Sequence, residues 1–330
     1  MRRGVLLFNL GGPENLREVR PFLYNLFSDP EIIRIRGNLP RKTLARIISI
    51  ARQKKSKDLY RQIGGGSPLR RITEDQAAAL KTALDSREFP AEIYVAMRCW
   101  KPTIDEAVMS ILRDNIEQLI LLPLFPQFSL TTTGSCLKHF QSLDCALGLS
   151  SKMQIHAIKE WFDEPLYIQA VANTIREAMH KFSAGKSPVI LYSAHSIPEK
   201  YIAEGDPYLK QIQQTVALVN AELGNAHPYR LAFQSKVGPV KWLSPATKDI
   251  VMRLGREGCE RALIVPLGFV SDHLETLQEI DISYRDIALQ SGIKEFHRAA
   301  SLNLDPLFIS ALANIILKEA GSANASPALF

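Results

Sequence analysis

Cysteine is scarce in this 330-residue sequence, and the few cysteines form no recognisable motif. There is neither a C-x-x-C pair nor a Cys/His spacing of the kind that binds zinc, which argues against a metal or cluster held by thiolates. Such usage is typical of a protein in a reducing compartment. The four cysteines are Cys99, Cys136, Cys145 and Cys259.

Long hydrophobic runs are also missing. The longest apolar stretch, residues 119–125, contains Pro123 and is far too short to cross a bilayer. The N-terminal apolar segment is shorter than a signal-peptide core and is predicted to be the first strand. We therefore expect a cytoplasmic protein. Residues 321–330 are small and polar, and are predicted to be a disordered tail.

Nucleotide-binding motifs are absent as well. The segment Gly64–Pro68 reads GGGSP, but it lacks the Gly-Lys-Ser/Thr of a P-loop and does not follow an apolar strand. No G-x-G-x-x-G opens a helix elsewhere. We therefore reject nucleotide binding, although a glycine-rich backbone permits close approach of a flat or bulky ligand.

Positive charge is in modest excess, with 40 Lys and Arg against 34 Asp and Glu. The net charge of +6 suits an acidic partner, which could be substrate carboxylates, a membrane surface or nucleic acid. Charge alone does not choose among these. The length is sufficient for about two domains.

Short apolar runs alternate with amphipathic helical patterns along the chain, which predicts βαβ units and parallel sheets. The predicted strands are 4–10, 92–97, 118–124, 154–158, 188–193, 229–233, 262–269 and 295–299. The clearest predicted helices are 103–114, 165–182, 208–223 and 245–257.

The two halves of this pattern resemble each other. Each half has a loop with Trp and Pro, then a helix, then an apolar strand with an interior proline, Pro123 or Pro266. Any two βαβ units share some likeness, but the shared Leu-Pro-Leu favours duplication. We expect an α/β fold of two similar Rossmann-like lobes, each a four-stranded parallel sheet flanked by helices, with a ligand cleft between them. The expected boundaries are 1–160, joined by a helix at 305–320, and 161–304.

Residues 34–62 differ from the rest in being strongly basic. An apolar stripe of Leu44, Ile47, Ile48 and Ala51 recurs at helical spacing among the basic side chains. A basic amphipathic helix can lie on an anionic membrane, or it can pack on its own domain with a solvated basic face. The sequence leaves both interpretations open.

Candidate chemical groups follow two of the predicted strands. His195 follows the fifth strand, and Glu275 begins a helix after the seventh. In an α/β sheet functional side chains gather at these carboxyl ends, so an imidazole and a carboxylate can face each other there. The pair offers a proton acceptor and an open set of metal ligands, suited to a metal in transit.

The helix after the seventh strand carries further acids. Asp272, Glu275 and Glu279 are spaced i, i+3 and i+7, which predicts three carboxylates on one α-helical face. The competing interpretation is structural: Asp272 and Glu275 also match a D-x-x-E capping pattern on a solvated helix.

Several motifs together resemble the ferrochelatases, which insert ferrous iron into a porphyrin at the end of haem synthesis. The resemblance covers residues 4–317. The motifs are L-x-N-L-G-G-P at 7–13, Tyr60 with GGGSP, Met97-Arg98, P-Q-x-S at 126–129 with TTGS at 132–135, Ser193-Ala194-His195, Q-S-x-V-G-P at 234–239 with Trp242, and S-D-H-x-E-T-L at 271–277 with Glu279 and Asp281.

The resemblance implies roles for individual residues. His195 and Glu275 would be catalytic and would contact the metal. The residues expected along a proton or metal path are Asp272, His273, Glu279 and Asp281. The expected porphyrin-binding residues are Leu10, Arg52, Lys55, Tyr60, Ser67, Arg98, Phe128 and Trp242. Residues 34–62 would then be a lip that touches an anionic membrane, which places the protein on the inner membrane surface.

The resemblance also sets expectations about cofactors and partners. Iron would be a substrate, with no organic cofactor and no iron–sulfur cluster, because the cysteine-bearing extension of some members is absent. The partners would be a porphyrin and ferrous iron but no nucleic acid, and the protein would be a monomer or weak homodimer. Protoporphyrin IX is the expected porphyrin, with coproporphyrin left open.

The sequence departs from the family at one motif and leaves other functions open. Arg98-Cys99-Trp100-Lys101-Pro102 replaces the usual Arg-Tyr-x-His-Pro, so the roles of Cys99 and Lys101 are undecided. A related cobalt or nickel chelatase and a porphyrin or haem carrier without turnover are the alternatives.

Overall fold

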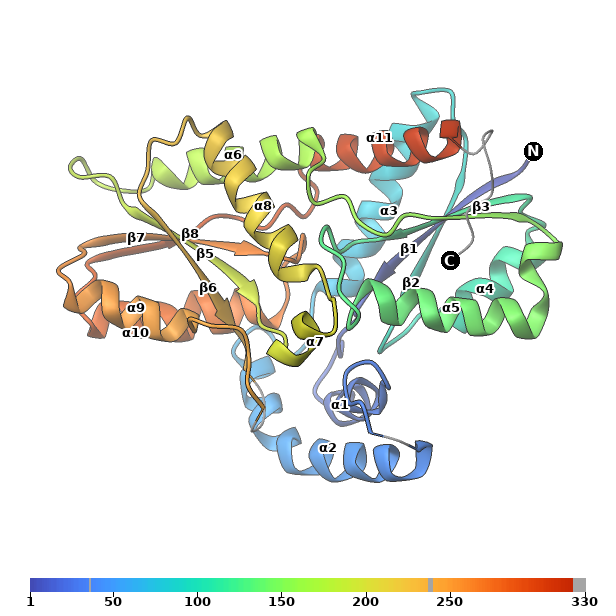
Figure 1. The fold of residues 1–330 in the computed structure, drawn as a ribbon, viewed down its shortest axis with the longest axis horizontal. Helices are drawn as coiled ribbons and strands as arrows, with labels where there is room; N and C mark the ends of the chain where they lie inside the picture. The colour runs from blue at the N-terminus through green and yellow to red at the C-terminus, as the bar shows by residue number, and fades with distance from the viewer. Residues whose placement is uncertain (36, 237–239, 323–330) are drawn as a thin grey trace. The chain divides into compact units, whose positions relative to one another are not determined.

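The computed structural model describes residues 1–35, 37–236 and 240–322. Within these residues, eight strands form two parallel sheets of four strands, each flanked by helices (Figure 1). The predicted α/β class and the parallel sheets are therefore confirmed. The chain divides into two compact units, residues 1–161 with 309–322 and residues 162–308.

Unit 1 contains the first sheet, in the strand order β2-β1-β3-β4. Its strands are β1 (Arg3–Asn9), β2 (Glu92–Met97), β3 (Gln118–Pro123) and β4 (Gln154–Ala157). Its helices are α1 (Val19–Ser28), α2 (Asn38–Arg61), α3 (Leu69–Asp85), α4 (Ile104–Arg113), α5 (Thr133–Leu147), the 3₁₀ turn η1 (Leu149–Ser151) and most of α11 (Pro306–Ser322).

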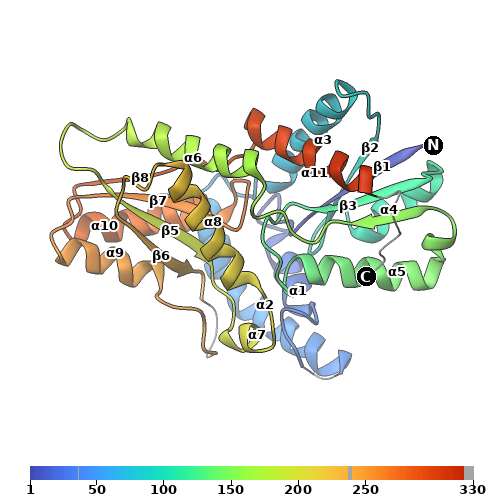
Figure 2. The same ribbon diagram turned by 45° about the horizontal axis from the view of Figure 1, so that its top comes forward.

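Unit 2 contains the second sheet, in the order β6-β5-β7-β8. Its strands are β5 (Val189–His195), β6 (Tyr229–Gln234), β7 (Arg261–Leu267) and β8 (Glu295–Arg298). Its helices are α6 (Pro165–Met179), α7 (Glu199–Ala203), α8 (Tyr208–Glu222), α9 (Thr247–Arg256), the π-helix η2 (Glu275–Tyr284) and α10 (Arg285–Gln290). Figures 1 and 2 show α6 and α8 on one face of this sheet and α9 and α10 on the other.

The two sheets have the same internal order, which supports the predicted likeness of the lobes. The first strand of each lobe lies between the second and the third. Pro123 and Pro266 each lie in the third strand, where they pair with Phe8 and Ser193 of the first strand.

Local sequence signals explain where several helices begin and end. Helix α4 begins with a capping box, in which Thr103 Oγ1 accepts from the backbone N–H of Glu106 at 3.1 Å. In return the Glu106 carboxylate accepts from the backbone N–H of Thr103 at 2.8 Å. Helix α5 ends at Gly148, whose φ of 64° is the left-handed conformation that glycine adopts at no steric cost.

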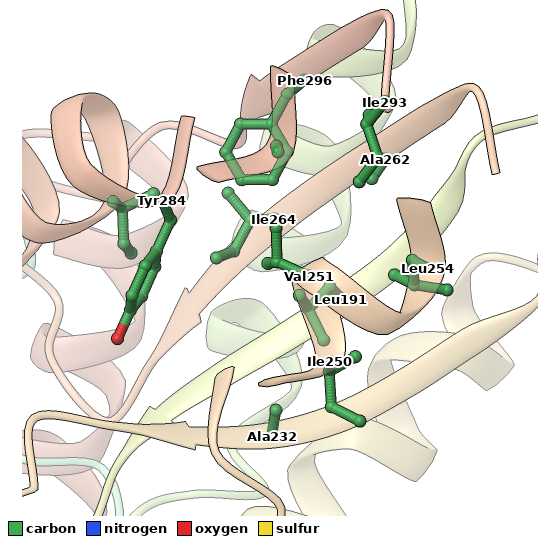
Figure 3. Close-up of a cluster of buried hydrophobic side chains, with 12 residues drawn as sticks. Leu191, Ala232, Ile250, Val251, Leu254, Ala262, Ile264, Tyr284, Ile293 and Phe296 are labelled. Atoms are coloured by element: carbon green, nitrogen blue, oxygen red, sulfur yellow. The ribbon is translucent and has the colours of Figure 1, made fainter. Parts of the chain in front are cut away.

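An apolar cluster in unit 2 fixes η2 against the sheet (Figure 3). Leu191 and Ile264 contribute from β5 and β7, Val251 from α9, Tyr284 from the end of η2 and Phe296 from β8. Each such side chain stabilises the fold by roughly 1.5–3 kcal/mol when it is fully buried. The cluster holds the helix that carries Glu275 close to the strand that ends in His195.

Helix α2 packs through small side chains rather than through its predicted apolar stripe. Ala45, Ser49 and Ser56 are buried, whereas Ile47 is 59 % exposed and Ala51 is also exposed. Small residues let α1 approach closely, so the larger apolar side chains are left facing outward. Leu44 and Ile48, the rest of the stripe, are half-buried. Helix α2 thus packs on its own unit, as one of the two interpretations expected, but Ile47 and Ala51 of the stripe do not take part in that packing.

The end of the chain is ordered further than expected. Gly321 and Ser322 continue α11, so the predicted tail does not begin at residue 321. The rest of that tail, 323–330, and residues 237–239 of the Q-S-x-V-G-P motif lie outside the described residues. Among the described helices, none combines the length and the apolar character needed to cross a membrane.

Candidate active site

The fold of unit 2 brings His195 and Glu275 into direct contact. His195 is the last residue of β5 and Glu275 is the first of η2. His195 Nδ1 lies 3.0 Å from Glu275 Oε2. The two side chains are 32 % and 20 % exposed, so the pair is sheltered but reachable. The contact arises because β5 and β7 are neighbouring parallel strands, whose carboxyl ends lie at one edge of the sheet.

The helix that carries Glu275 is a π-helix, and this changes the predicted row of acids. The π-helix begins only at Glu275, so Asp272 lies before the helix and cannot share a helical face with Glu275 and Glu279. Glu279 stays in the environment of Glu275, whose charge influences its titration. Asp272 instead pairs with an arginine, so the prediction of three carboxylates on one face is wrong.

Glu275 accepts hydrogen bonds from more than one side. Gln234 Nε2 donates to Oε2 at 3.0 Å, and His273 Nε2 lies 3.7 Å from the same oxygen. Gln234 is the last residue of β6, beside β5. The carboxylate is therefore held between the ends of two neighbouring strands.

The electrostatics of the pair favour the charged forms of both partners. Burial acts to lower the pKa of His195, but the charge and hydrogen bond of Glu275 outweigh it, and that pKa is raised. Burial acts to raise the pKa of Glu275, but His195 and His273 hold it well below its usual value. Each group therefore stabilises the charged form of the other, and the two titrate as a coupled pair.

The pKa of Glu279 is shifted in the opposite direction from that of Glu275. Burial and the nearby charge of Glu275 raise its pKa, although Ser235 and Tyr284 donate hydrogen bonds that act against the rise. The Tyr284 hydroxyl donates to Glu279 Oε1 at 2.6 Å. A carboxyl group with a raised pKa beside an ionised one is a better proton carrier than an ordinary carboxylate.

Asp272 and Asp281 converge on Arg298 of β8, a residue that the sequence did not identify. Arg298 Nε donates to Asp281 at 2.7 Å, and its Nη1 donates to Asp272 at 3.1 Å. Ser301 and Asn303 also donate to the Asp272 carboxylate, at 2.8 and 2.9 Å. Burial acts to raise the pKa of Asp272, but Arg298 and these hydrogen bonds lower it.

The capping interpretation of Asp272 fails for the same reason. No side chain caps the start of η2 within the described residues, and the Asp272 carboxylate is occupied by its other partners. Sequence spacing offered no signal for Arg298, which lies 26 residues from Asp272.

Aromatic side chains surround the histidines. The ring of Phe269 lies 5.9 Å from that of His195 and 4.6 Å from that of His273. The Tyr208 hydroxyl donates to the backbone carbonyl of His195 at 3.0 Å. These contacts leave the imidazole little freedom to turn. Neither aromatic residue was predicted to belong to the site: Phe269 ends a predicted strand, and Tyr208 begins a predicted helix.

The residues predicted to contact a porphyrin lie in both units. Those in unit 1 are Leu10, Arg52, Lys55, Tyr60, Ser67, Arg98 and Phe128. Tyr60 is buried and Lys55 exposed, and the Arg52 guanidinium lies 5.7 Å from the Phe27 ring centroid. Trp242 is half-buried in unit 2, where it pairs with Pro198. Their contact with a porphyrin stays a prediction, as does the predicted cleft.

The glycine-rich segment contacts its own chain. A Cβ at Gly66 would lie 2.1 Å from the carbonyl oxygen of Glu14, so only glycine fits there. Ser67 donates its backbone N–H to the carbonyl of Pro13 at 2.7 Å. The glycines thereby join the loop after β1 to the loop before α3.

Arg98 is bound within unit 1 rather than free. Its Nη2 lies 3.1 Å from Asp29 Oδ2, and its Nε donates to Ser135 Oγ at 2.7 Å. Cys99 beside it is buried, which raises the pKa of its thiol strongly and leaves it a poor nucleophile or ligand. Lys101 is exposed.

The described residues contain no group of three or more His, Cys, Asp or Glu side chains arranged to hold a metal ion. The His195–Glu275 pair supplies two ligands at most from its own atoms, with His273 at the edge. Such an arrangement can bind a metal briefly and exchange protons with a neighbouring ligand.

Comparisons with known proteins agree on one family. The model of the ferrochelatase family matches residues 2–320. A ferrochelatase of Thermosynechococcus vestitus is 47 % identical over 321 residues, covering 97 % of this chain and 82 % of that protein. A ferrochelatase of Gloeothece citriformis is 45 % identical over 319 residues, covering 96 % and 82 %.

Two solved structures share the fold at low sequence identity. SirB from Bacillus subtilis, determined with Fe³⁺, has a TM-score of 0.56 and 12 % identity, covering 99 % of each chain. CbiX, described as the terminal enzyme of sirohaem biosynthesis in denitrifying bacteria, has a TM-score of 0.52 and 15 % identity, covering 96 % of this chain and 99 % of that one. These likenesses extend to the architecture alone.

Proposed function

Because this chain belongs to the ferrochelatase family, it inserts ferrous iron into a porphyrin, and we propose that His195 and Glu275 carry the reaction. The observation that supports this assignment is the 3.0 Å contact of an imidazole and a carboxylate at adjoining strand ends. Two pyrrole N–H bonds break, iron bonds to all four porphyrin nitrogens, and two protons leave. No change of oxidation state is needed.

The free atoms of the pair suit these two tasks. His195 uses Nδ1 for Glu275, so Nε2 is the nitrogen that can accept a pyrrole proton or contact iron. Glu275 has two oxygens, and Oε2 already receives Gln234 as well. Oε1 also lies 3.0 Å from His195 Nδ1 but receives no bond from Gln234, so it has more capacity for the metal. The two residues thus supply a base and a hard ligand within one contact.

A proton path would lead from Glu275 to Glu279. The raised pKa of Glu279 suits a carboxyl group that takes up a proton and passes it on. His273, 3.7 Å from Glu275, would belong to the same path. Asp272 and Asp281 belonged to the predicted path too, but their ion pairs with Arg298 favour the role of anchoring η2.

The porphyrin is proposed to be protoporphyrin IX. Arg52, Lys55, Tyr60 and Ser67 would bind its propionate groups, since cations and hydroxyl groups suit carboxylates. Leu10, Phe128 and Trp242 would contact the flat macrocycle, which favours apolar and aromatic surfaces. Iron would arrive as a substrate, without an organic cofactor or an iron–sulfur cluster.

Helix α2 is proposed to touch an anionic membrane from the cytoplasmic side. Leu39, Ile47 and Ile50 are exposed, with 79 %, 59 % and 46 % of their surfaces accessible. Lys54 and Lys55 are exposed on the same helix. Apolar side chains among basic ones match the chemistry of an anionic lipid surface. Protoporphyrin is poorly soluble in water and would enter from that surface.

The assignment is tested by mixing protein with anaerobic Fe²⁺ and porphyrin and following the absorbance change on metallation. We expect His195→Ala to lower turnover by about 10²–10⁴-fold, the usual contribution of a positioned acid or base, while porphyrin binding survives. His227→Ala, which removes a histidine bonded only to Ser187 in the described contacts, is the matched control. If His195→Ala lost porphyrin affinity as much as turnover, His195 would be a porphyrin-contacting residue rather than a base.

A further inference from the structure

A row of buried polar side chains leads through unit 2 to Glu275. Thr247 and Ser193 are fully buried, and Gln234 is 4 % exposed. Thr247 Oγ1 lies 2.7 Å from Ser193 Oγ, and Ser193 Oγ lies 2.6 Å from Gln234 Oε1. Gln234 Nε2 lies 3.0 Å from Glu275 Oε2. The row connects α9, β5, β6 and η2.

The direction of each hydrogen bond in this row follows from the number of protons available. An amide oxygen only accepts, so Ser193 must donate its single hydroxyl proton to Gln234. Ser193 must then accept from Thr247. If the Gln234 amide were reversed, its oxygen would face the oxygen of an ionised carboxylate without a proton between them. The Glu275 carboxylate therefore fixes the amide with its N–H toward itself, and Ser193, supported by Thr247, holds the amide oxygen on the other side.

The same row determines which nitrogen of His195 is free. Glu275 Oε2 accepts from Gln234 Nε2 and from His195 Nδ1, each at 3.0 Å. His195 Nδ1 also lies 3.0 Å from Oε1, so the Gln234 bond is the one that a turn of the carboxylate would break. Since an ionised carboxylate only accepts, Nδ1 must carry a proton, and the neutral imidazole keeps its lone pair on Nε2. Gln234 thus acts on His195 through Glu275.

We propose that Gln234 is a positioning residue, anchored by Ser193 and Thr247, that holds Glu275 so that His195 presents Nε2 as its basic nitrogen. This inference deepens the proposed function and rests on it. Groups that orient a metal ligand or base from behind typically change affinity or activity by about 10- to 100-fold when they are removed.

The test combines kinetics with a spectroscopic readout in the full chain. Gln234→Met keeps the length of the side chain but removes both hydrogen bonds. We expect it to lower kcat of iron insertion by about 10- to 100-fold, with porphyrin affinity changed less than about twofold. In ¹⁵N NMR spectra recorded at alkaline pH, where the imidazole is neutral, we expect His195 to shift from the Nδ1–H tautomer toward the Nε2–H tautomer.

Two further variants separate positioning from general stability. Asn220→Leu removes another buried amide of unit 2, which donates to the Val216 carbonyl, and we expect kcat and the His195 tautomer to stay unchanged. Ser193→Ala frees the Gln234 amide to turn while leaving it present, and we expect a smaller shift in the same direction. If Gln234→Met fails to fold, Ser193→Ala decides.

Two results would overturn the proposal. One is full turnover in Gln234→Met with His195 still protonated on Nδ1. The other is an equal loss of turnover in Asn220→Leu, which would assign the effect to stability. The NMR readout needs no iron or porphyrin. It therefore tests Gln234 even if His195→Ala shows that the proposed base is wrong.

Discussion

The imidazole of His195 donates its Nδ1 proton to the carboxylate of Glu275 over 3.0 Å, although 80 residues separate the two in the chain. The contact exists because one residue ends a central strand and the other begins the helix after the neighbouring strand. Four predictions follow the consequences of this arrangement and of the ion pairs and helix around it.

The first prediction concerns the carboxylate of the pair. Glu275→Gln keeps the size of the side chain and can still accept from His195, but it cannot take up a proton. We expect turnover to fall by at least about 10²-fold, with the melting temperature close to that of the wild type. Thermal unfolding and the metallation assay check this. Glu257→Gln, at the exposed end of α9, is the control. A large fall in melting temperature would show that Glu275 serves mainly to stabilise η2.

The second prediction concerns acid stability through Asp272. Its pKa is lower in the folded chain than in the unfolded one, so its ion pair with Arg298 stabilises the fold above the unfolded pKa of about 3.9. This stability is lost as the pH falls through the folded pKa. We expect Asp272→Asn to cost about 1–3 kcal/mol at pH 7, because it leaves buried donors poorly matched. The difference in the free energy of unfolding between the variant and the wild type should become smaller below about pH 4.

Urea unfolding at several pH values measures this gap. Glu260→Gln, which breaks an exposed ion pair with Lys294, is the control and should leave stability unchanged at every pH. A gap that stayed constant with pH would mean that the Asp272 carboxylate contributes through shape rather than charge.

The third prediction distinguishes two roles of Arg98. Asp29 is 1 % exposed and pairs with Arg98, so Arg98→Ala leaves a buried carboxylate without its cation. We expect a loss of about 3–5 kcal/mol in the free energy of unfolding. Arg113→Ala, at the exposed end of α4, should have little effect. If Arg98→Ala instead weakens porphyrin binding at unchanged stability, the guanidinium serves the ligand and not the fold.

The fourth prediction concerns α2 and lipid. Charge reversal at Lys54 and Lys55 should weaken sedimentation with vesicles that contain phosphatidylserine, by about 1 kcal/mol for each charge removed and most visibly at low salt. Ile47→Ser should weaken binding at all salt concentrations, because it removes apolar contact. Reversal at the exposed Lys152 of unit 1 is the control. If all variants sedimented like the wild type, α2 would not contact the membrane, and its basic side chains would simply face the solvent.

Much of the architecture could be predicted because it depends on local patterns. Apolar runs placed all eight strands of the described residues within two residues of their observed ends, since strands buried on both faces must be continuously apolar. His195 was found because strand ends are where functional groups gather. The position of Glu275 followed from the same rule.

Other features depend on contacts that have no local signature. Asp272 lies before the helix begins, and its partner Arg298 comes from a strand that follows the helix. Gln234 gains its role only because β6 lies beside β5, which requires the strand order. In α2, the apolar stripe did not decide between packing and membrane contact, and the buried small residues Ala45 and Ser49, which carry no hydrophobic signal, determined which face packs.

Unit 1 is formed by two segments that lie far apart in the sequence, and this sets an order of events during synthesis. Residues 309–322 complete this unit, and Ser310 accepts a hydrogen bond from Arg87 beyond the end of α3. A ribosome makes the whole of unit 2 before it reaches them, and domains generally fold as they emerge. The half of the protein that is translated first is therefore the half that must wait for its closing helix.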